Sequence, residues 1–226
     1  MSFNINSSVQ PTWIPENIVI SDNNFLSRSA ILEILHEIYP ESRVSVGNEF
    51  SDAIRLISQE CKPQSSLLLV VDFSGDKQTP LAFYNTMRKY FARKPNLKVV
   101  IYTSVEDCFF ISSVSSFISG GVILKKEPVR SIKKLFCSLS ETNEVLFSDS
   151  VHQLVGDYRM PSISPKAIQG YFAELAENQL SVSSRITESK YKTFYSRRYN
   201  TVEKLGFKSM RQYYVYLSKI NDMLYR

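Results

Sequence analysis

Short runs of aliphatic and β-branched residues alternate with amphipathic segments over the first 140 residues of the chain. Five runs have the length and composition of buried strands, namely 18–21, 43–46, 67–71, 98–102 and 121–124. Apolar residues recur at helical spacing in the segments that follow them, namely 25–38, 50–60, 81–92, 108–118 and 129–139. Strands that alternate with helices in this way are typical of a parallel sheet covered on both faces. We therefore predict an α/β fold with a five-stranded, doubly wound parallel sheet.

The pattern changes along the chain, and the changes predict its domains. Residues 1–16 are polar and form a predicted N-terminal extension, and residues 17–140 form the predicted α/β domain. Residues 141–160 are rich in polar and turn-forming residues, which indicates a linker. Residues 161–226 show only helical patterns, so we predict an all-α domain after the linker.

Four helices are predicted within residues 161–226. The first begins near Ser164 and Pro165, and a shorter helix covers 180–186. A polar turn at 187–189 leads into a longer helix over 190–205, which ends at Gly206, and a last helix covers 210–224. A short helix, a turn and a longer basic helix are typical of a helix-turn-helix, whose second helix lies in the DNA major groove.

Positive charge is concentrated in the same region. The chain has a formal net charge of +5, and residues 161–226 alone carry 11 basic and 5 acidic side chains. An excess of positive charge in one domain favours contact with a polyanion, and surface solubility is the plainer alternative. The candidate DNA-binding residues lie on the longer basic helix and just after it: Lys190, Lys192, Thr193, Tyr195, Ser196, Arg197, Arg198, Lys204 and Lys208.

The remaining composition argues against several classes of protein. Cys61, Cys108 and Cys137 are odd in number and widely spaced in apolar segments, which predicts reduced residues in a cytoplasmic protein. The sequence shows no secretion signal and no apolar run of membrane-spanning length, so we expect no membrane partner. His36 and His152 stand apart from any nucleophile pattern, and the 7 glycines form no phosphate-binding loop. We therefore expect a protein that is not an enzyme.

Four polar residues directly follow predicted strands: Asp22, Asp72, Thr103 and Lys125. The carboxyl ends of parallel strands meet at one edge of the sheet, where open sheets bind their ligands. Two carboxylates can hold a divalent cation, and one of them can accept a phosphoryl group whose oxygens a hydroxyl and an ammonium neutralise. One polar residue at a strand end means little, but these four types together indicate a phosphoryl-accepting pocket.

Four segments around these residues resemble the receiver domain of two-component response regulators: 18–23, 69–72, 99–103 and 121–125. The resemblance implies that Asp72 is the phosphate acceptor, Thr103 the switch hydroxyl and Lys125 the lysine that pairs with the phosphate. The sequence departs from the family at Asn23, where receivers carry a second acid that binds the metal directly. An amide supplies no charge, so we expect an atypical receiver that requires no cofactor and binds Mg²⁺ only weakly through Asp22 and Asp72.

Three segments of the helical domain carry a second resemblance: Ile163-Ser164-Pro165-Lys166, Ile186-Thr187-Glu188-Ser189 and Lys204-Leu205-Gly206. They resemble LuxR-type (FixJ/NarL-type) DNA-binding domains, and their spacing is similar to that of the Rcs-type regulators of capsule synthesis. The resemblance implies groove-facing positions for Lys192, Thr193, Ser196 and Arg197. It also implies phosphate contacts for Lys204 and Lys208.

In this family the final helix often pairs two protomers, and its candidate pairing residues are Met210, Tyr213, Tyr214 and Leu217. The same side chains could instead pack on the core of their own domain. We predict a bacterial, sequence-specific transcription regulator that binds double-stranded DNA as a homodimer, or as a heterodimer with another LuxR-type response regulator. The alternative is an interaction protein that contacts RNA polymerase or another regulator and does not bind DNA alone.

Overall fold

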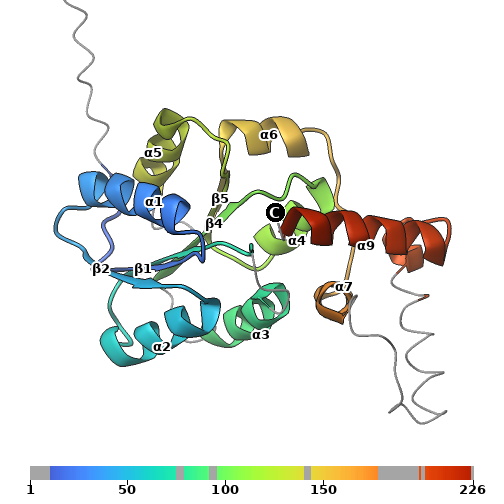
Figure 1. Cartoon of the computed structure of the whole chain (residues 1–226), viewed down its shortest axis with the longest axis horizontal. Helices are drawn as coiled ribbons and strands as arrows, with labels where there is room; N and C mark the ends of the chain where they lie inside the picture. Colours follow the sequence, from blue (N-terminus) through green and yellow to red (C-terminus); the bar gives the residue numbers. More distant parts are fainter. Residues whose placement is uncertain are drawn as a thin grey trace, which may run out of the picture.

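The computed structural model describes residues 11–74, 79–91, 96–139, 144–177, 199 and 202–224. Its centre is a six-stranded sheet in the order β2-β1-β3-β4-β5-β6, and all neighbouring strands are parallel. The strands are β1 (Asn17–Ser21), β2 (Arg43–Gly47), β3 (Leu67–Val71), β4 (Leu97–Thr103), β5 (Gly120–Leu124) and β6 (Val145–Phe147). The helices are α1 (Phe25–Ile38), α2 (Phe50–Glu60), α3 (Thr79–Phe91), α4 (Cys108–Ser115), α5 (Val129–Ser138), α6 (Asp149–Val155), α7 (Pro165–Glu177) and α9 (Met210–Leu224). Helices cover both faces of the sheet (Figure 1), which confirms the predicted α/β class.

The sheet has one strand more than the sequence pattern predicts. β6 pairs with β5, with Val145 opposite Gly120, and α6 follows it directly. Both elements lie within residues 141–160, so the predicted number of five strands is wrong and this stretch is more than a linker. The reason is length: a strand of three half-buried residues is too short to show an alternating pattern.

Alternate residues of the central strands pack into separate cores on the two faces of the sheet. On β1, Ile18 and Ile20 belong to the core that includes α1 and α5, whereas Val19 belongs to the core that includes α2, α3 and α4. Because all strands run in the same direction, the residues that follow β1, β3 and β5 meet at one edge of the sheet. This edge is where the sequence predicts the polar pocket.

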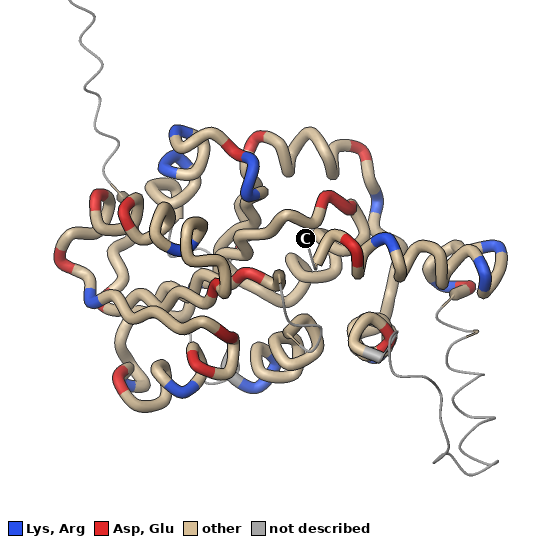
Figure 2. The backbone as a smooth tube through the Cα atoms, viewed as in Figure 1, with Lys and Arg blue, Asp and Glu red and all other residues tan. Residues whose placement is uncertain are grey.

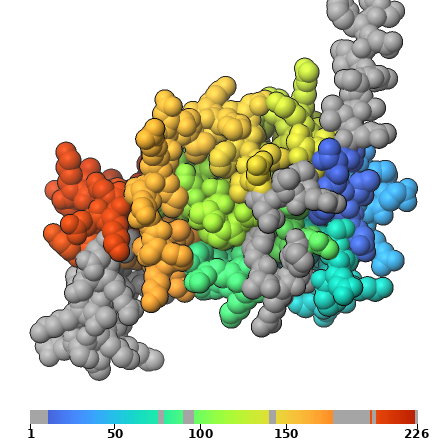
Figure 3. Space-filling model, turned by 180° about the vertical axis from the view of Figure 1, so that it is seen from behind, coloured from blue at the N-terminus to red at the C-terminus, as the bar shows by residue number. Residues whose placement is uncertain are grey.

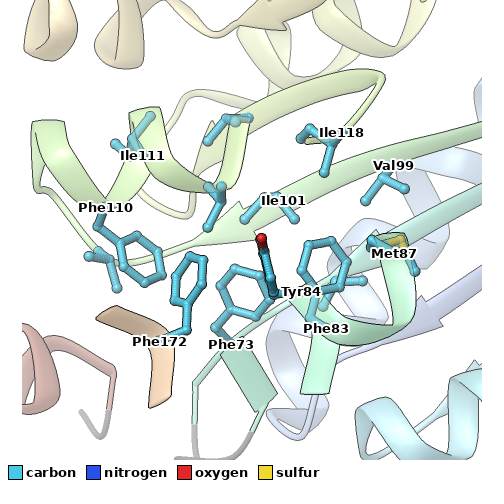
Figure 4. Close-up of a cluster of buried hydrophobic side chains, with 14 of the residues drawn as sticks. Phe73, Phe83, Tyr84, Met87, Val99, Ile101, Phe110, Ile111, Ile118 and Phe172 are labelled. Atoms are coloured by element: carbon cyan, nitrogen blue, oxygen red, sulfur yellow. The ribbon is translucent and has the colours of Figure 1, made fainter. Parts of the chain in front are cut away.

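The C-terminal helices α7 and α9 share the core on the second face. Helix α7 packs on α3, and Phe172 of α7 is fully buried. Its ring centroid lies 5.8 Å from that of Tyr84, 6.1 Å from that of Phe117 and 6.2 Å from that of Phe110. Figure 4 shows Phe172 pointing into this cluster, and in Figure 3 the orange segment lies against the green one with the red segment beyond it. The α/β part and the C-terminal helices are therefore joined by one hydrophobic core.

The cysteines lie in the α/β part as free thiols. Cys137 is buried, and Cys61 and Cys108 are half-buried. The thiol of Cys108 donates a hydrogen bond to the backbone oxygen of Leu154 at 3.0 Å, so it takes part in the packing of α4 against α6. Within the described ranges, no helix is both long enough and apolar enough to cross a membrane.

Candidate functional site

Three of the predicted pocket residues meet at the carboxyl edge of the sheet. Asp22 and Asp72 follow the paired strands β1 and β3 directly, and their exposed fractions are 3% and 5%. Lys125 follows β5, and its Nζ lies 2.8 Å from Oδ2 of Asp72 and 3.1 Å from Oδ2 of Asp22. One ammonium therefore bridges two buried carboxylates.

The oxygens of Asp22 also accept hydrogen bonds from the segment that follows β1. Oδ1 accepts a hydrogen bond from the backbone N–H of Asn24 at 2.8 Å, and Oδ2 accepts one from Oγ of Ser27 at 2.6 Å. Asn24 in turn caps α1, because its side chain accepts from the backbone N–H of Ser27 at 3.0 Å. On the other carboxylate, Oδ1 of Asp72 accepts from Oγ of Ser74 at 2.9 Å. The protein itself thus supplies a donor to each oxygen of both carboxylates.

Two predicted pocket residues do not join this network in the described structure. Thr103 is fully buried, and its Oγ1 accepts a hydrogen bond from the backbone N–H of Val105 at 3.1 Å. This bond fixes the loop between β4 and α4. Asn23 has an exposed side chain next to the buried Asp22. The arrangement therefore centres on Asp22, Asp72 and Lys125.

Burial and charge act in opposite directions on these groups. Burial raises the pKa of Asp72, because it outweighs the attraction and the hydrogen bond from Lys125. Burial alone would lower the pKa of Lys125, but Asp72 and Asp22 more than offset this effect, so the pKa of the ammonium is raised. Lys125 therefore keeps its positive charge between the two carboxylates. Among the described residues, no group of three or more His, Cys, Asp and Glu side chains is arranged to hold a metal ion.

Several residues that the sequence did not predict also shape the pocket. Ser27 and Ser74 lie five and two residues after the carboxylates they bind, and such short spacings of Ser after Asp are a usable signal. Arg28 donates to the backbone oxygen of Asp22 at 2.7 Å. Tyr102 lies beneath the pocket, with its ring centroid 5.4 Å from Nζ of Lys125. Nothing in the sequence marks Tyr102, because it occupies an ordinary position of a buried strand.

Most of the predicted DNA-binding residues lie outside the described part of the chain, namely Lys190, Lys192, Thr193, Tyr195, Ser196, Arg197 and Arg198. Lys204 and Lys208 are described, and both are exposed on either side of Gly206. Gly206 has a φ of 76°, which confirms the predicted left-handed end of the helix. Figure 2 shows basic residues at this outer end of the C-terminal helices.

The predicted pairing face of α9 lies partly in the core of the chain itself. Tyr213 and Leu217 are fully buried within this chain, because that stripe of α9 packs into the core it shares with α7. Of the two roles that the sequence left open for these side chains, this burial supports packing on the core, and a pairing role stays a prediction. Met210 and Tyr214 are only partly buried, and their contact with a second protomer stays a prediction.

Solved structures resemble this arrangement over almost its whole length. RcsB of Salmonella enterica serovar Typhimurium, bound to the promoter P1flhDC with the phosphomimetic BeF3⁻, matches with a TM-score of 0.57 and 22% identity, over 91% of this chain and 99% of that one. A structure of two RcsB dimers bound to two parallel DNAs matches with a TM-score of 0.56 and 20% identity, over 90% of this chain and 98% of that one. The chain has the fold of the response regulator RcsB.

The likeness confirms the fold expected from the sequence: a receiver-like parallel sheet followed by a helical C-terminal region. It covers both parts, since the match extends over about nine tenths of each chain. At the level of sequence, no protein-family model matches the chain, and a search of curated proteins finds no match. The fold is therefore recognised from its three-dimensional arrangement.

Proposed function

We propose that the chain is a bacterial, cytoplasmic transcription regulator that binds specific double-stranded DNA and is not an enzyme. The observation that carries this proposal is the fold, because both the receiver-like part and the C-terminal helices match RcsB in its complexes with DNA. The excess of 11 basic over 5 acidic residues in 161–226 supports it, since phosphate neutralisation dominates the affinity of DNA-binding proteins. RcsB binds as dimers in one of these structures, which supports a dimer here.

We also propose that the receiver pocket is held by Lys125 and does not depend on Mg²⁺ or phosphate. The ammonium lies between Asp22 and Asp72, where a divalent cation would have to bind. Both oxygens of Asp22 already accept hydrogen bonds, from the backbone of Asn24, from Ser27 and from Lys125. A cation would therefore have to displace these donors, and the pocket does not fit it. Control would then come from a partner, such as a second copy or another LuxR-type regulator.

Genome-wide mapping of the DNA bound by the full-length protein tests the regulatory function. We expect bound sites that share a common sequence, and purified protein alone should bind the same fragments. The matched control is the double substitution Lys192→Ala and Arg197→Ala, which should lose the sites. If the purified protein alone binds none of the mapped fragments, the protein is instead an accessory subunit that contacts RNA polymerase or another regulator.

A phosphodonor experiment tests the proposal for the pocket. The protein is incubated with a small-molecule phosphodonor and Mg²⁺, and its intact mass is measured against an Asp72→Ala control. We expect no phosphate adduct, and we expect Mg²⁺ to leave the thermal unfolding midpoint unchanged. An adduct that forms on the wild type and disappears in Asp72→Ala contradicts the proposal.

A further inference from the structure

Asp107 connects the receiver-like part to the last helix through a single oxygen atom. It is the N-cap of α4, and its Oδ1 accepts a hydrogen bond from the backbone N–H of Phe110 at 2.8 Å. The hydroxyl of Tyr216, in α9, donates to the same Oδ1 at 2.7 Å. The two residues are 109 positions apart in the sequence, so this bond joins two segments that are far apart along the chain.

Tyr216 is fixed by its neighbours as well as by Asp107. Its hydroxyl lies 3.2 Å from that of Tyr171 in α7, and its ring stacks on the Tyr171 ring at 6.4 Å between centroids. Phe109, in the first turn of α4, lies edge-on to the Tyr216 ring at 6.5 Å. Burial first, and the nearby Tyr171 and Asp107, raise the pKa of Tyr216 far above its ordinary value, so the phenol stays a hydrogen-bond donor.

Tyr216 also touches the turn that ends the predicted DNA-binding helix. The ring of Phe207 lies 5.0 Å from that of Tyr216. Phe207 is bound to the last turn of this helix, because its backbone N–H donates to the oxygen of Val202 at 3.0 Å. The backbone N–H of Gly206 donates to the oxygen of Glu203 at 3.0 Å in the same turn. The helix end therefore moves with Phe207, and Phe207 packs on Tyr216.

We propose that Asp107 and Tyr216 are positioning residues that set the DNA-binding helix relative to the receiver-like part. Packed aromatic rings tolerate sliding, whereas a hydrogen bond fixes the direction and the distance between its donor and its acceptor. The loop that ends at Asp107 begins at Thr103, whose hydroxyl holds Val105. A continuous path of contacts thus runs from the edge of the receiver pocket to the end of the DNA-binding helix. This inference rests on the proposed DNA-binding function.

Tyr216→Phe removes only the hydroxyl and tests the proposal directly. We expect the affinity for a mapped DNA site to fall about tenfold, which corresponds to about 1.4 kcal/mol. The slope of log affinity against log salt should stay unchanged, because the substitution removes no phosphate contact. The control Tyr39→Phe also removes a buried hydroxyl, which donates to the backbone oxygen of Phe136 at 2.6 Å on the opposite face of the sheet, and it should bind DNA like the wild type.

Two substitutions of Asp107 separate positioning from folding. Both Asn and Ser can cap α4, but only the longer Asn places an oxygen where the hydroxyl of Tyr216 can donate to it. We expect Asp107→Asn to bind DNA within about twofold of the wild type, and Asp107→Ser to bind about tenfold more weakly, as Tyr216→Phe does. These two variants also decide the matter if Tyr216→Phe fails to fold.

Equal DNA affinity of Asp107→Ser, Asp107→Asn and the wild type overturns the positioning role, and it leaves the proposed function in place. Failure of the wild-type protein to bind any mapped DNA site refutes the proposed function instead, and the positioning role with it. Circular dichroism and the thermal midpoint of each variant confirm that the comparison is made between folded proteins.

Discussion

Lys125 is the residue on which the state of the receiver pocket depends. Its ammonium is the cation within hydrogen-bond distance of both Asp22 and Asp72, and each of these carboxylates is almost fully buried. Removing one partner of a buried ion pair is costly because it leaves uncompensated charge in a poorly solvated place. The contribution of Lys125 can therefore be measured as a change in the free energy of unfolding.

We expect Lys125→Met to lower the free energy of unfolding by about 3–5 kcal/mol at pH 7. The deficit relative to wild type should shrink as the pH falls, because protonation removes the repulsion between Asp22 and Asp72. Urea denaturation at pH 7 and near pH 4 measures both effects. The control is Lys134→Met, which breaks an exposed ion pair with Asp149 and should change stability little. A Lys125→Met protein as stable as the wild type at pH 7 contradicts this account.

The sequence alone predicted the pocket residues that directly follow strands. It could not decide the role of a side chain where that role depends on burial. Asp22, Asp72 and Lys125 were found because parallel strands bring their carboxyl ends together. The role of Tyr213 stayed open between pairing and core packing, because helical spacing shows that a stripe is apolar but not which surface covers it. Thr103 lies where the sequence predicts, yet its hydroxyl turns to its own loop, a detail that only the backbone conformation determines.

At the scale of elements, the sheet depends on a close approach between β4 and β5. Gly120, the first residue of β5, has a φ of 140°, and a Cβ atom built there would lie 2.3 Å from the backbone oxygen of Val99. Only glycine fits this position. On its other side, β5 pairs with β6, the strand that the sequence pattern did not predict because it is so short.

We expect Gly120→Ala to lower the free energy of unfolding by about 3 kcal/mol, since it combines backbone strain with a clash against a strand backbone. Gly206→Ala is the matched control. Gly206 also has a positive φ, of 76°, but no atom lies within 4 Å of a Cβ there. It should cost only about 1–2 kcal/mol, the strain alone. Chemical denaturation measures both, and equal losses for the two variants contradict the assigned clash.

At the scale of the whole molecule, the receiver-like part and the C-terminal helices are not joined by a linker alone. Phe172 of α7 is surrounded by rings of α3, α4 and the segment after α4. The sequence predicts two domains separated by a linker, because a periodic pattern gives the apolar face of a helix without its neighbour. The shared core makes cooperative unfolding a measurable consequence.

We expect the full chain to unfold in a single transition, observed equally by far-ultraviolet circular dichroism and by tyrosine fluorescence. Phe172→Ala should lower the stability by about 3–5 kcal/mol and move the whole transition. Two separate transitions in the wild type, or a Phe172→Ala transition confined to one part of the signal, would show that the parts unfold independently.

The central claim is that the chain binds DNA through its basic C-terminal region, and the salt dependence of binding tests it most directly. We measure the affinity of the purified full-length protein for a mapped site between about 50 and 200 mM salt. The same measurement is made on a double variant that carries both Lys204→Ala and Lys208→Ala. The wild type should bind less tightly as salt rises, and the double variant should have a slope shallower by about two units. The control Lys89→Ala removes an exposed lysine of α3 and should keep the wild-type slope. An affinity that does not change with salt concentration, or no DNA binding by the purified protein alone, would contradict the account.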